Sequence, residues 1–165
     1  MILETILTLT GVTAIASIVN LFDKFKGSNN ESISIKKYMP GDLPIITLYN
    51  NDTPFNFLLD TGSNICHICP SAMKNIRYNS IDKSNTETVG LGGKSVQSNN
   101  CKATFTDEKN REYSINLVIS KEFEMSANSI EKCIGVKING LLGTDFLQNY
   151  KYVIDFTTLE VHARR

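Results

Sequence analysis

Proline and glycine are both scarce in this chain, and neither sign of charge is in excess. Its 165 residues include 4 prolines and 10 glycines, and 17 basic side chains balance 17 acidic ones. The low proline and glycine content excludes fibrous and linker-like proteins. The balanced charge gives no reason to expect a nucleic acid as the partner. A chain of this length can bury a core of its own, so we expect one globular domain.

Cysteine is also rare. It occurs only at Cys66, Cys69, Cys101 and Cys133. Small secreted proteins use closely spaced disulfides for stability, but this chain is too large to need them and its cysteine spacing differs from theirs. We therefore predict four free thiols.

The first part of the chain lacks charge over a long stretch. No charged residue occurs between Thr5 and Phe22, and most residues of this stretch are apolar. A membrane-spanning helix needs roughly 20 mostly apolar residues, a length that the stretch just satisfies. No lysine or arginine precedes it, which disfavours a cleaved signal peptide. We predict a hydrophobic transmembrane helix over residues 1–26, with a buried or amphipathic surface helix as the alternative.

The charges that flank this stretch predict its orientation. Glu4 precedes it, and four lysines follow it: Lys24, Lys26, Lys36 and Lys37. Because the positive flank of a membrane helix tends to stay in the cytoplasm, we expect a single-pass membrane protein whose remaining part is cytoplasmic. The cytoplasm would also keep the thiols reduced.

The remaining chain divides into a linker and a domain. Residues 27–33 are mostly small and polar, as in a short linker, and we place the folded domain at 34–165. Within it, short apolar and β-branched runs alternate with turn signals, which is typical of a compact, mainly β domain. Strands are predicted over residues 43–49, 54–59, 65–68, 86–91, 94–97, 101–106, 112–119, 152–156 and 159–162. A proline-opened turn is predicted over 70–74, and a short helix over 144–148.

One carboxylate stands out at the end of a predicted strand. Asp60 directly follows the apolar residues 57–59 and directly precedes Thr61 and Gly62. The glycine allows the backbone to approach the carboxylate closely. An Asp-Thr-Gly triplet by itself is also compatible with an ordinary surface turn.

A second segment repeats part of this pattern. Leu141 and Leu142 precede Gly143, just as two apolar residues precede the turn at Asp60. In a β domain, the repeat suggests two related halves that meet at one site.

These two segments, together with the glycine-bearing segment Gly90-Leu91-Gly92-Gly93, resemble the retropepsin-like aspartic peptidases. The resemblance covers roughly residues 38–163. It implies an all-β fold, a closed β-barrel lobe with one short C-terminal helix, which here would follow the N-terminal hydrophobic helix. It also implies that the lobe is active only as a homodimer.

The resemblance assigns roles to individual residues. Asp60 is the catalytic carboxylate, Thr61 bonds across the dimer axis, the Gly62 N–H donates to the Asp60 carboxylate, and Ser63 contacts the outer carboxylate oxygen. Leu141, Leu142 and Gly143 form the structural turn of the second half. The segment Gly90, Leu91, Gly92, Gly93 is the flap, for which an ordinary glycine hairpin is the alternative.

This interpretation also covers Asp145 and two segments that could hold extra residues. Asp145 stands where a helix N-terminus favours its charge, so we assign it a capping or packing role. The second carboxylate then comes from Asp60 of a second copy. The chain between the two motifs is longer than in minimal members of the family, and we place the extra residues in 74–86 or 121–132.

The predicted function is therefore a membrane-anchored aspartic endopeptidase that hydrolyses polypeptides with an activated water, without a metal or other cofactor. One alternative is a catalytically silent peptide-binding or dimerisation module with the same fold. Another is a thiol or zinc protein that uses the C-x-x-C pair Cys66 and Cys69. Because the sequence holds no second paired motif, we predict no metal site.

Overall fold

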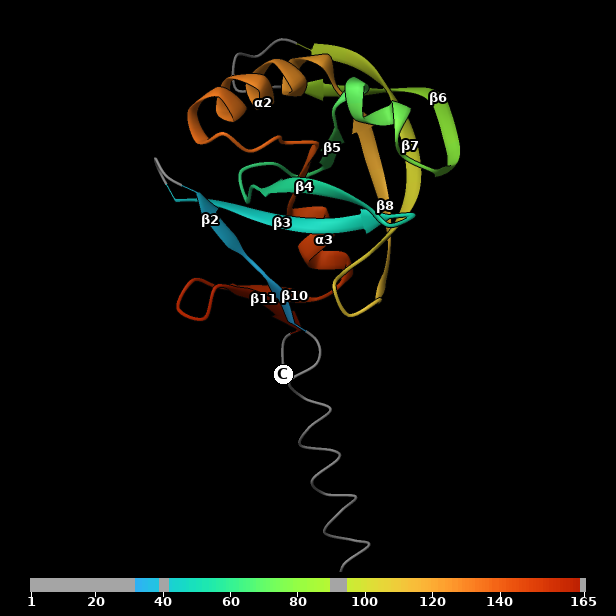
Figure 1. Cartoon of the computed structure of the whole chain (residues 1–165). Coiled ribbons are helices and arrows are strands. Elements are labelled where there is room, and N and C mark those ends of the chain that lie inside the picture. The colour runs from blue at the N-terminus through green and yellow to red at the C-terminus, as the bar shows by residue number, and fades with distance from the viewer. Residues whose placement is uncertain (1–31, 39–41, 90–94, 164–165) are drawn as a thin grey trace, which may run out of the picture. The chain divides into compact units, whose positions relative to one another are not determined.

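The computed structural model of the chain describes residues 32–38, 42–89 and 95–163 (Figure 1). Eleven strands lie within these ranges: β1 (Ser32–Ser34), β2 (Lys36–Tyr38), β3 (Leu43–Asn50), β4 (Thr53–Leu59), β5 (Cys66–Ile68), β6 (Tyr78–Val89), β7 (Ser95–Thr106), β8 (Glu112–Ile119), β9 (Gly140–Leu142), β10 (Tyr152–Asp155) and β11 (Glu160–Ala163). The helical elements are η2 (Pro70–Lys74), α2 (Lys121–Ile134) and α3 (Thr144–Asn149).

Six of the strands form a closed barrel. In the larger sheet, the strands β3, β4, β9, β5, β8 and β7 are neighbours in that order, and β3 pairs again with β7 through Tyr49 and Thr106. The strands β2 and β6 extend this sheet beyond β3 and β7. A smaller sheet has the order β1-β11-β10. The predicted all-β barrel with a short C-terminal helix, α3, is confirmed.

The turns follow from local sequence. Between β3 and β4, Asn51 and Asp52 have positive φ angles of 50° and 62°. Asparagine and aspartate tolerate this left-handed conformation, which matches the twist of a two-residue hairpin. The predicted hairpins β3–β4, β7–β8 and β10–β11 are all antiparallel pairs. The hairpin β6–β7 is longer than predicted, since its strands extend back to Tyr78 and forward to Thr106.

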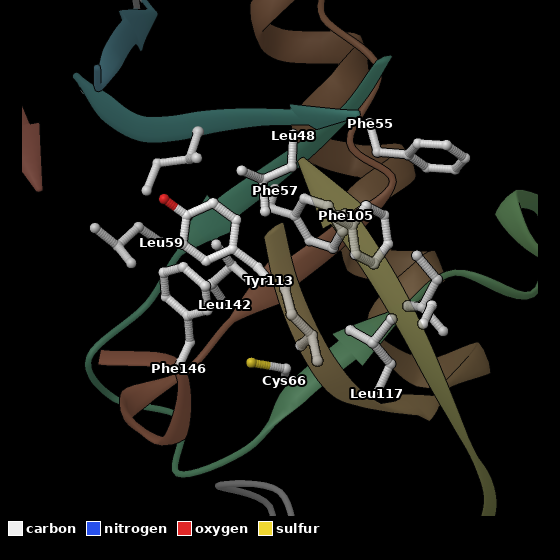
Figure 2. Packing of buried hydrophobic residues seen from close by; sticks show 14 of the residues in the cluster. Leu48, Phe55, Phe57, Leu59, Cys66, Phe105, Tyr113, Leu117, Leu142 and Phe146 are labelled. Atoms are coloured by element: carbon white, nitrogen blue, oxygen red, sulfur yellow. The ribbon is translucent and has the colours of Figure 1, made fainter. Parts of the chain in front are cut away.

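Aromatic side chains fill the barrel. Phe105 packs edge-on against Phe55 and Phe57, with ring centroids 5.7 and 5.2 Å apart. Figure 2 shows this group next to a second one in which Tyr113 and Phe146 lie close to Leu142. The strands alternate buried and exposed residues, as β8 shows, so each contributes one face to this core.

The helix α2 occupies the segment 121–132 that the sequence marks as inserted. Its ends carry ordinary signals: the Ser120 hydroxyl accepts from the Phe123 N–H at 3.0 Å, and Gly135 closes the helix with φ 71°. The helix packs on β5, β9 and η2. The other candidate insertion, 74–86, falls largely in β6.

No helix of the described ranges is long and apolar enough to cross a membrane. The predicted transmembrane helix, residues 1–26, lies outside the described residues, as does most of the predicted linker.

A buried carboxylate fixes the turn between β7 and β8. Asp107 is only 4% exposed and accepts hydrogen bonds from the Arg111 guanidinium, the Tyr113 hydroxyl and the Lys109 backbone N–H. Burial raises the pKa of Asp107, but the bonds to Arg111, Lys109 and Tyr113 outweigh it, so the pKa lies below its ordinary value. The charged carboxylate therefore stabilises the fold.

The variant Asp107→Asn should lower the free energy of unfolding by roughly 2 to 3 kcal/mol at neutral pH, because it removes the buried carboxylate of a partly buried ion pair. Its pH dependence follows from the lowered pKa. The stabilisation is complete above the ordinary value of 3.8 and disappears as the pH falls through the lower folded value. Urea unfolding from pH 7 to pH 3 measures both effects. Glu108→Gln, an exposed change in the same turn, is the control. Equal stability of Asp107→Asn and this control would contradict the assignment.

Candidate active site

Asp60 lies at the carboxyl end of β4, directly beside β9. The two strands are parallel neighbours, with Leu58 opposite Leu141 and Leu59 opposite Leu142. The Asp60 N–H donates to the Leu142 carbonyl at 3.0 Å, which continues this pairing by one residue. The two segments singled out in the sequence are therefore brought together at one place.

The turn after Asp60 folds back onto its carboxylate. The Gly62 N–H donates to Asp60 Oδ1 at 2.8 Å, as predicted, and the Ser63 N–H donates to the Asp60 carbonyl at 3.2 Å. A methyl group on residue 62 would lie 3.0 Å from Oδ1, so glycine allows the tight approach. Asp60 itself is partly exposed, and Thr61 and Gly62 are exposed. The turn thus presents a carboxylate to solvent with one oxygen held in place.

Ser63 has a different partner from the predicted one. Its hydroxyl donates to the Ile65 carbonyl at 2.8 Å, rather than to the outer oxygen of Asp60. A hydroxyl has a single proton, so this bond leaves none for the carboxylate. The Ser63 carbonyl accepts from the Thr144 N–H at 2.9 Å. Ser63 therefore connects the turn to its own loop and to the start of α3.

Asp145 is partly buried and is held by hydrogen bonds within the domain, in agreement with a packing role. Its Oδ1 accepts from the Phe146 N–H at 2.7 Å and from the Cys66 thiol at 2.9 Å, and its Oδ2 accepts from the Cys66 N–H at 3.2 Å. These bonds join the first turn of α3 to the start of β5. Figure 2 shows Cys66 among the core side chains close to Phe146.

Gly143 is required by the close approach of two backbones. A methyl group on this residue would lie 2.5 Å from the Ile65 carbonyl oxygen and 2.8 Å from its carbon. Both contacts are with backbone, which cannot rotate away. The glycine of the second motif therefore lets β9 and α3 lie directly against the loop that follows Asp60.

The structure describes only some of the other predicted site residues. The flap residues Gly90, Leu91, Gly92 and Gly93 lie outside the described residues. The strands on either side of them pair antiparallel up to Val89 and Ser95. Thr61 is predicted to bond to a second copy of the chain across the dimer axis. The residue is exposed, so a second copy can reach it.

The cysteines are all free, and three of the four are buried. Burial raises the pKa of the Cys66 thiol, helped by its hydrogen bond to Asp145, and it raises the pKa of Cys69 to about 12. The Cys69 thiol faces the Ile138 carbonyl at 3.5 Å. Within the described part of the chain, no group of three or more potential ligands could hold a metal ion. Protonated, buried thiols of this kind are poor nucleophiles and poor metal ligands.

The comparisons with known proteins agree with this geometry. Residues 46–146, more than half of the chain, match the family described as aspartyl protease. The chain belongs to the aspartyl protease family. The matched range includes both the turn at Asp60 and the motif at Gly143.

Two solved protease structures are similar to this chain. The EIAV protease, solved in complex with an inhibitor, is 22% identical, and the similarity covers 69% of this chain and 93% of that protein with a TM-score of 0.48. A retropepsin-like aspartic protease from Rickettsia conorii is 15% identical over 79% of this chain and 87% of that protein, with a TM-score of 0.47. No curated protein matches the chain.

The variant Gly143→Ala should destabilise the protein by about 2 kcal/mol or more, because the added methyl group must displace backbone atoms. Gly135→Asn is the matched control. Gly135 has open space around it and a left-handed conformation that asparagine tolerates, so we expect a change below about 1 kcal/mol. Urea unfolding of both variants measures the difference. An unfolding midpoint of Gly143→Ala equal to that of the unmodified protein would contradict the close-approach argument.

Proposed function

We propose that this aspartyl protease is an active endopeptidase that works as a homodimer, with Asp60 of each copy as the catalytic pair. The observation that carries the proposal is the geometry of Asp60. It is a partly exposed carboxylate at a strand end, and the Gly62 N–H orients one of its oxygens. The edge of the turn, Thr61 and Gly62, is exposed and free to meet a second copy.

A second copy is needed because the nearby Asp145 is already engaged. Both of its oxygens accept hydrogen bonds from Cys66, and Oδ1 also accepts from the Phe146 N–H. Rotation of Asp145 toward Asp60 would leave these donors without an acceptor inside the fold, which is costly. The second catalytic carboxylate is therefore assigned to the partner copy.

Two such carboxylates in contact have a defined chemistry. Because like charges about 3 Å apart cannot both ionise, the pair shares one proton. The ionised member acts as a general base and takes a proton from a water, whose oxygen attacks the carbonyl of the peptide bond. The protonated member donates to the carbonyl oxygen and stabilises the tetrahedral intermediate. No metal or other cofactor is required.

The substrate proposed for this site is a polypeptide in an extended conformation, which strands and hairpins bind well. The hairpin β6–β7 supports this idea, because it extends as a long antiparallel pair toward residues 90–93. We propose that these residues, the predicted flap, cover the bound peptide.

Replacement of the carboxylate tests the proposed chemistry. The full-length variant Asp60→Asn should cleave peptides at least about a hundredfold more slowly, because asparagine cannot act as the base. Asp52→Asn is the same chemical change in an exposed turn and should keep full activity.

Specific activity should rise with protein concentration, and an excess of Asp60→Asn should suppress the unmodified protein by forming mixed dimers.

The two alternative functions, a silent binding module and a thiol enzyme, predict different results in this assay. An unmodified protein that binds peptides but cleaves none from acid to neutral pH would be a silent binding module. Activity that survives in Asp60→Asn and disappears in Cys66→Ser/Cys69→Ser would make the chain a thiol enzyme.

We further propose that residues 1–26 anchor the peptidase to a membrane, with the catalytic domain in the cytoplasm. The proposal is supported by the uncharged stretch from Thr5 to Phe22 and by the lysines that follow it. Two copies anchored in one membrane would meet more often than two copies in solution.

Charge placed in the stretch tests the anchor. The full-length double variant Val12→Arg/Ile15→Arg should move from the carbonate-resistant membrane fraction to the soluble fraction, since each central arginine costs about 3 kcal/mol to insert. Ser28→Arg/Asn30→Arg adds the same charge outside the stretch and should stay in the membrane fraction. Protease added to intact cells should leave the C-terminal part uncut. Digestion there, or an unmodified protein that is soluble, would refute the proposal.

A further inference from the structure

Three side chains on neighbouring strands share the outer face of the barrel beside Asp60. Leu58 on β4 is opposite Leu141 on β9, and Leu141 is opposite His67 on β5. Residues directly opposite each other on adjacent strands project to the same face of a sheet. Their chain neighbours belong to the core: Phe57, Leu59, Cys66, Ile68 and Leu142. Leu58, Leu141 and His67 therefore share the opposite face of the sheet, where Leu141 is buried and Leu58 and His67 are partly exposed.

Asp60 belongs to the same face. It follows Leu58 by two residues, and side chains two apart on a strand point to the same side. The negative charges of Asp60 and Asp145 both act on the His67 imidazole and favour its charged form. His67 is thus a polar side chain on the face that carries the proposed catalytic carboxylate.

The two ring nitrogens of His67 differ in their surroundings. Nδ1 is buried and has no hydrogen-bond partner, whereas the residue as a whole keeps partial exposure. The ring stacks on Phe123 of α2, with centroids 5.9 Å apart and planes inclined by 24°. Buried polar atoms without a partner are rare in folded proteins. For His67, Nδ1 is the ring nitrogen that is buried without a partner, which leaves Nε2 as the nitrogen available to a ligand.

The burial of Nδ1 determines which ring nitrogen carries the proton. Burial lowers the pKa of His67, against the opposing effect of Asp145 and Asp60, so the neutral ring is favoured. A neutral imidazole carries one proton, and burying an N–H without an acceptor is more costly than burying a lone pair. The proton therefore resides on Nε2, and Nδ1 is the unprotonated nitrogen.

We infer that His67 is a specificity-determining residue of the proposed peptidase, whose Nε2–H donates to an acceptor oxygen on one side chain of the bound peptide. The inference rests on the proposed function. It assigns the substrate class at one position, where a carboxamide or carboxylate side chain is selected over an aliphatic one. Phe123 is a positioning residue, because it fixes the plane of the ring without reaching the peptide through a polar atom.

Matched peptides test this selection. Asparagine and leucine have similar shapes and differ in the acceptor oxygen. The full-length protein is therefore assayed with peptides that carry one or the other at each of three positions on either side of the cleaved bond. The ratio of the two kcat/KM values should favour asparagine by about tenfold at one position. The variant His67→Leu should abolish or reverse this preference there and leave the other positions unchanged. His67→Gln, which keeps a side-chain N–H donor, should retain it.

Several outcomes would overturn the inference. One is an asparagine preference that survives in His67→Leu, and another is the absence of any such preference in the unmodified protein. A uniform loss of activity at all positions in a folded His67→Leu variant would indicate a purely structural role. If neither the unmodified protein nor its variants cleave any peptide, the proposed function itself fails, which is a different result.

A measurement on the unmodified protein avoids any dependence on folded variants. Nitrogen NMR of the histidine rings identifies the protonated nitrogen of His67, with His67→Gln used only to assign the signal. We expect the proton on Nε2 at neutral pH. A proton on Nδ1 would overturn the inference, because Nε2 would then have no hydrogen to donate.

Discussion

The parallel pairing of β4 with β9 is the contact on which the site depends. These two short strands come from distant parts of the sequence, and the Asp60 N–H continues their ladder by donating to the Leu142 carbonyl. The pairing orients the end of β4, and with it the first residue of the exposed turn. It also places Gly143 against the loop that follows the turn, at a distance that only glycine allows. Leu59 and Leu142 anchor both strands in the core.

A second set of bonds holds the far side of the same loop. The Ser63 hydroxyl and carbonyl bind Ile65 and Thr144, and Asp145 binds Cys66. The loop from Asp60 to Cys66 is thus attached to β9 and to α3 by polar contacts with little freedom to move. A loop so constrained can present one carboxylate in a fixed orientation, which general acid–base chemistry requires. The arrangement also explains why a carboxylate so near the site, Asp145, serves the fold.

Short-range sequence patterns predict much of the fold. The hairpins, the helix α3 and the meeting of the two glycine motifs were all predictable, because strand periodicity and turn residues act over a few positions. The sequence indicates α2 only as extra length between the two motifs, although Ser120 and Gly135 mark its ends. The partner of the Ser63 hydroxyl and the stack of His67 on Phe123 depend on contacts between backbones and elements that come together only on folding. Sequence spacing holds no information about such contacts.

The hydrogen bond between Cys66 and Asp145 has a consequence for redox chemistry. A thiol reacts with oxidants as the thiolate, and this thiol is buried, donates its proton to a carboxylate and has a raised pKa. Cys66 is therefore a structural hydrogen-bond donor placed a few residues from the proposed catalytic carboxylate. While the domain stays folded, oxidants that modify accessible cysteines will leave Cys66 unchanged, and the loop that it supports will keep its shape.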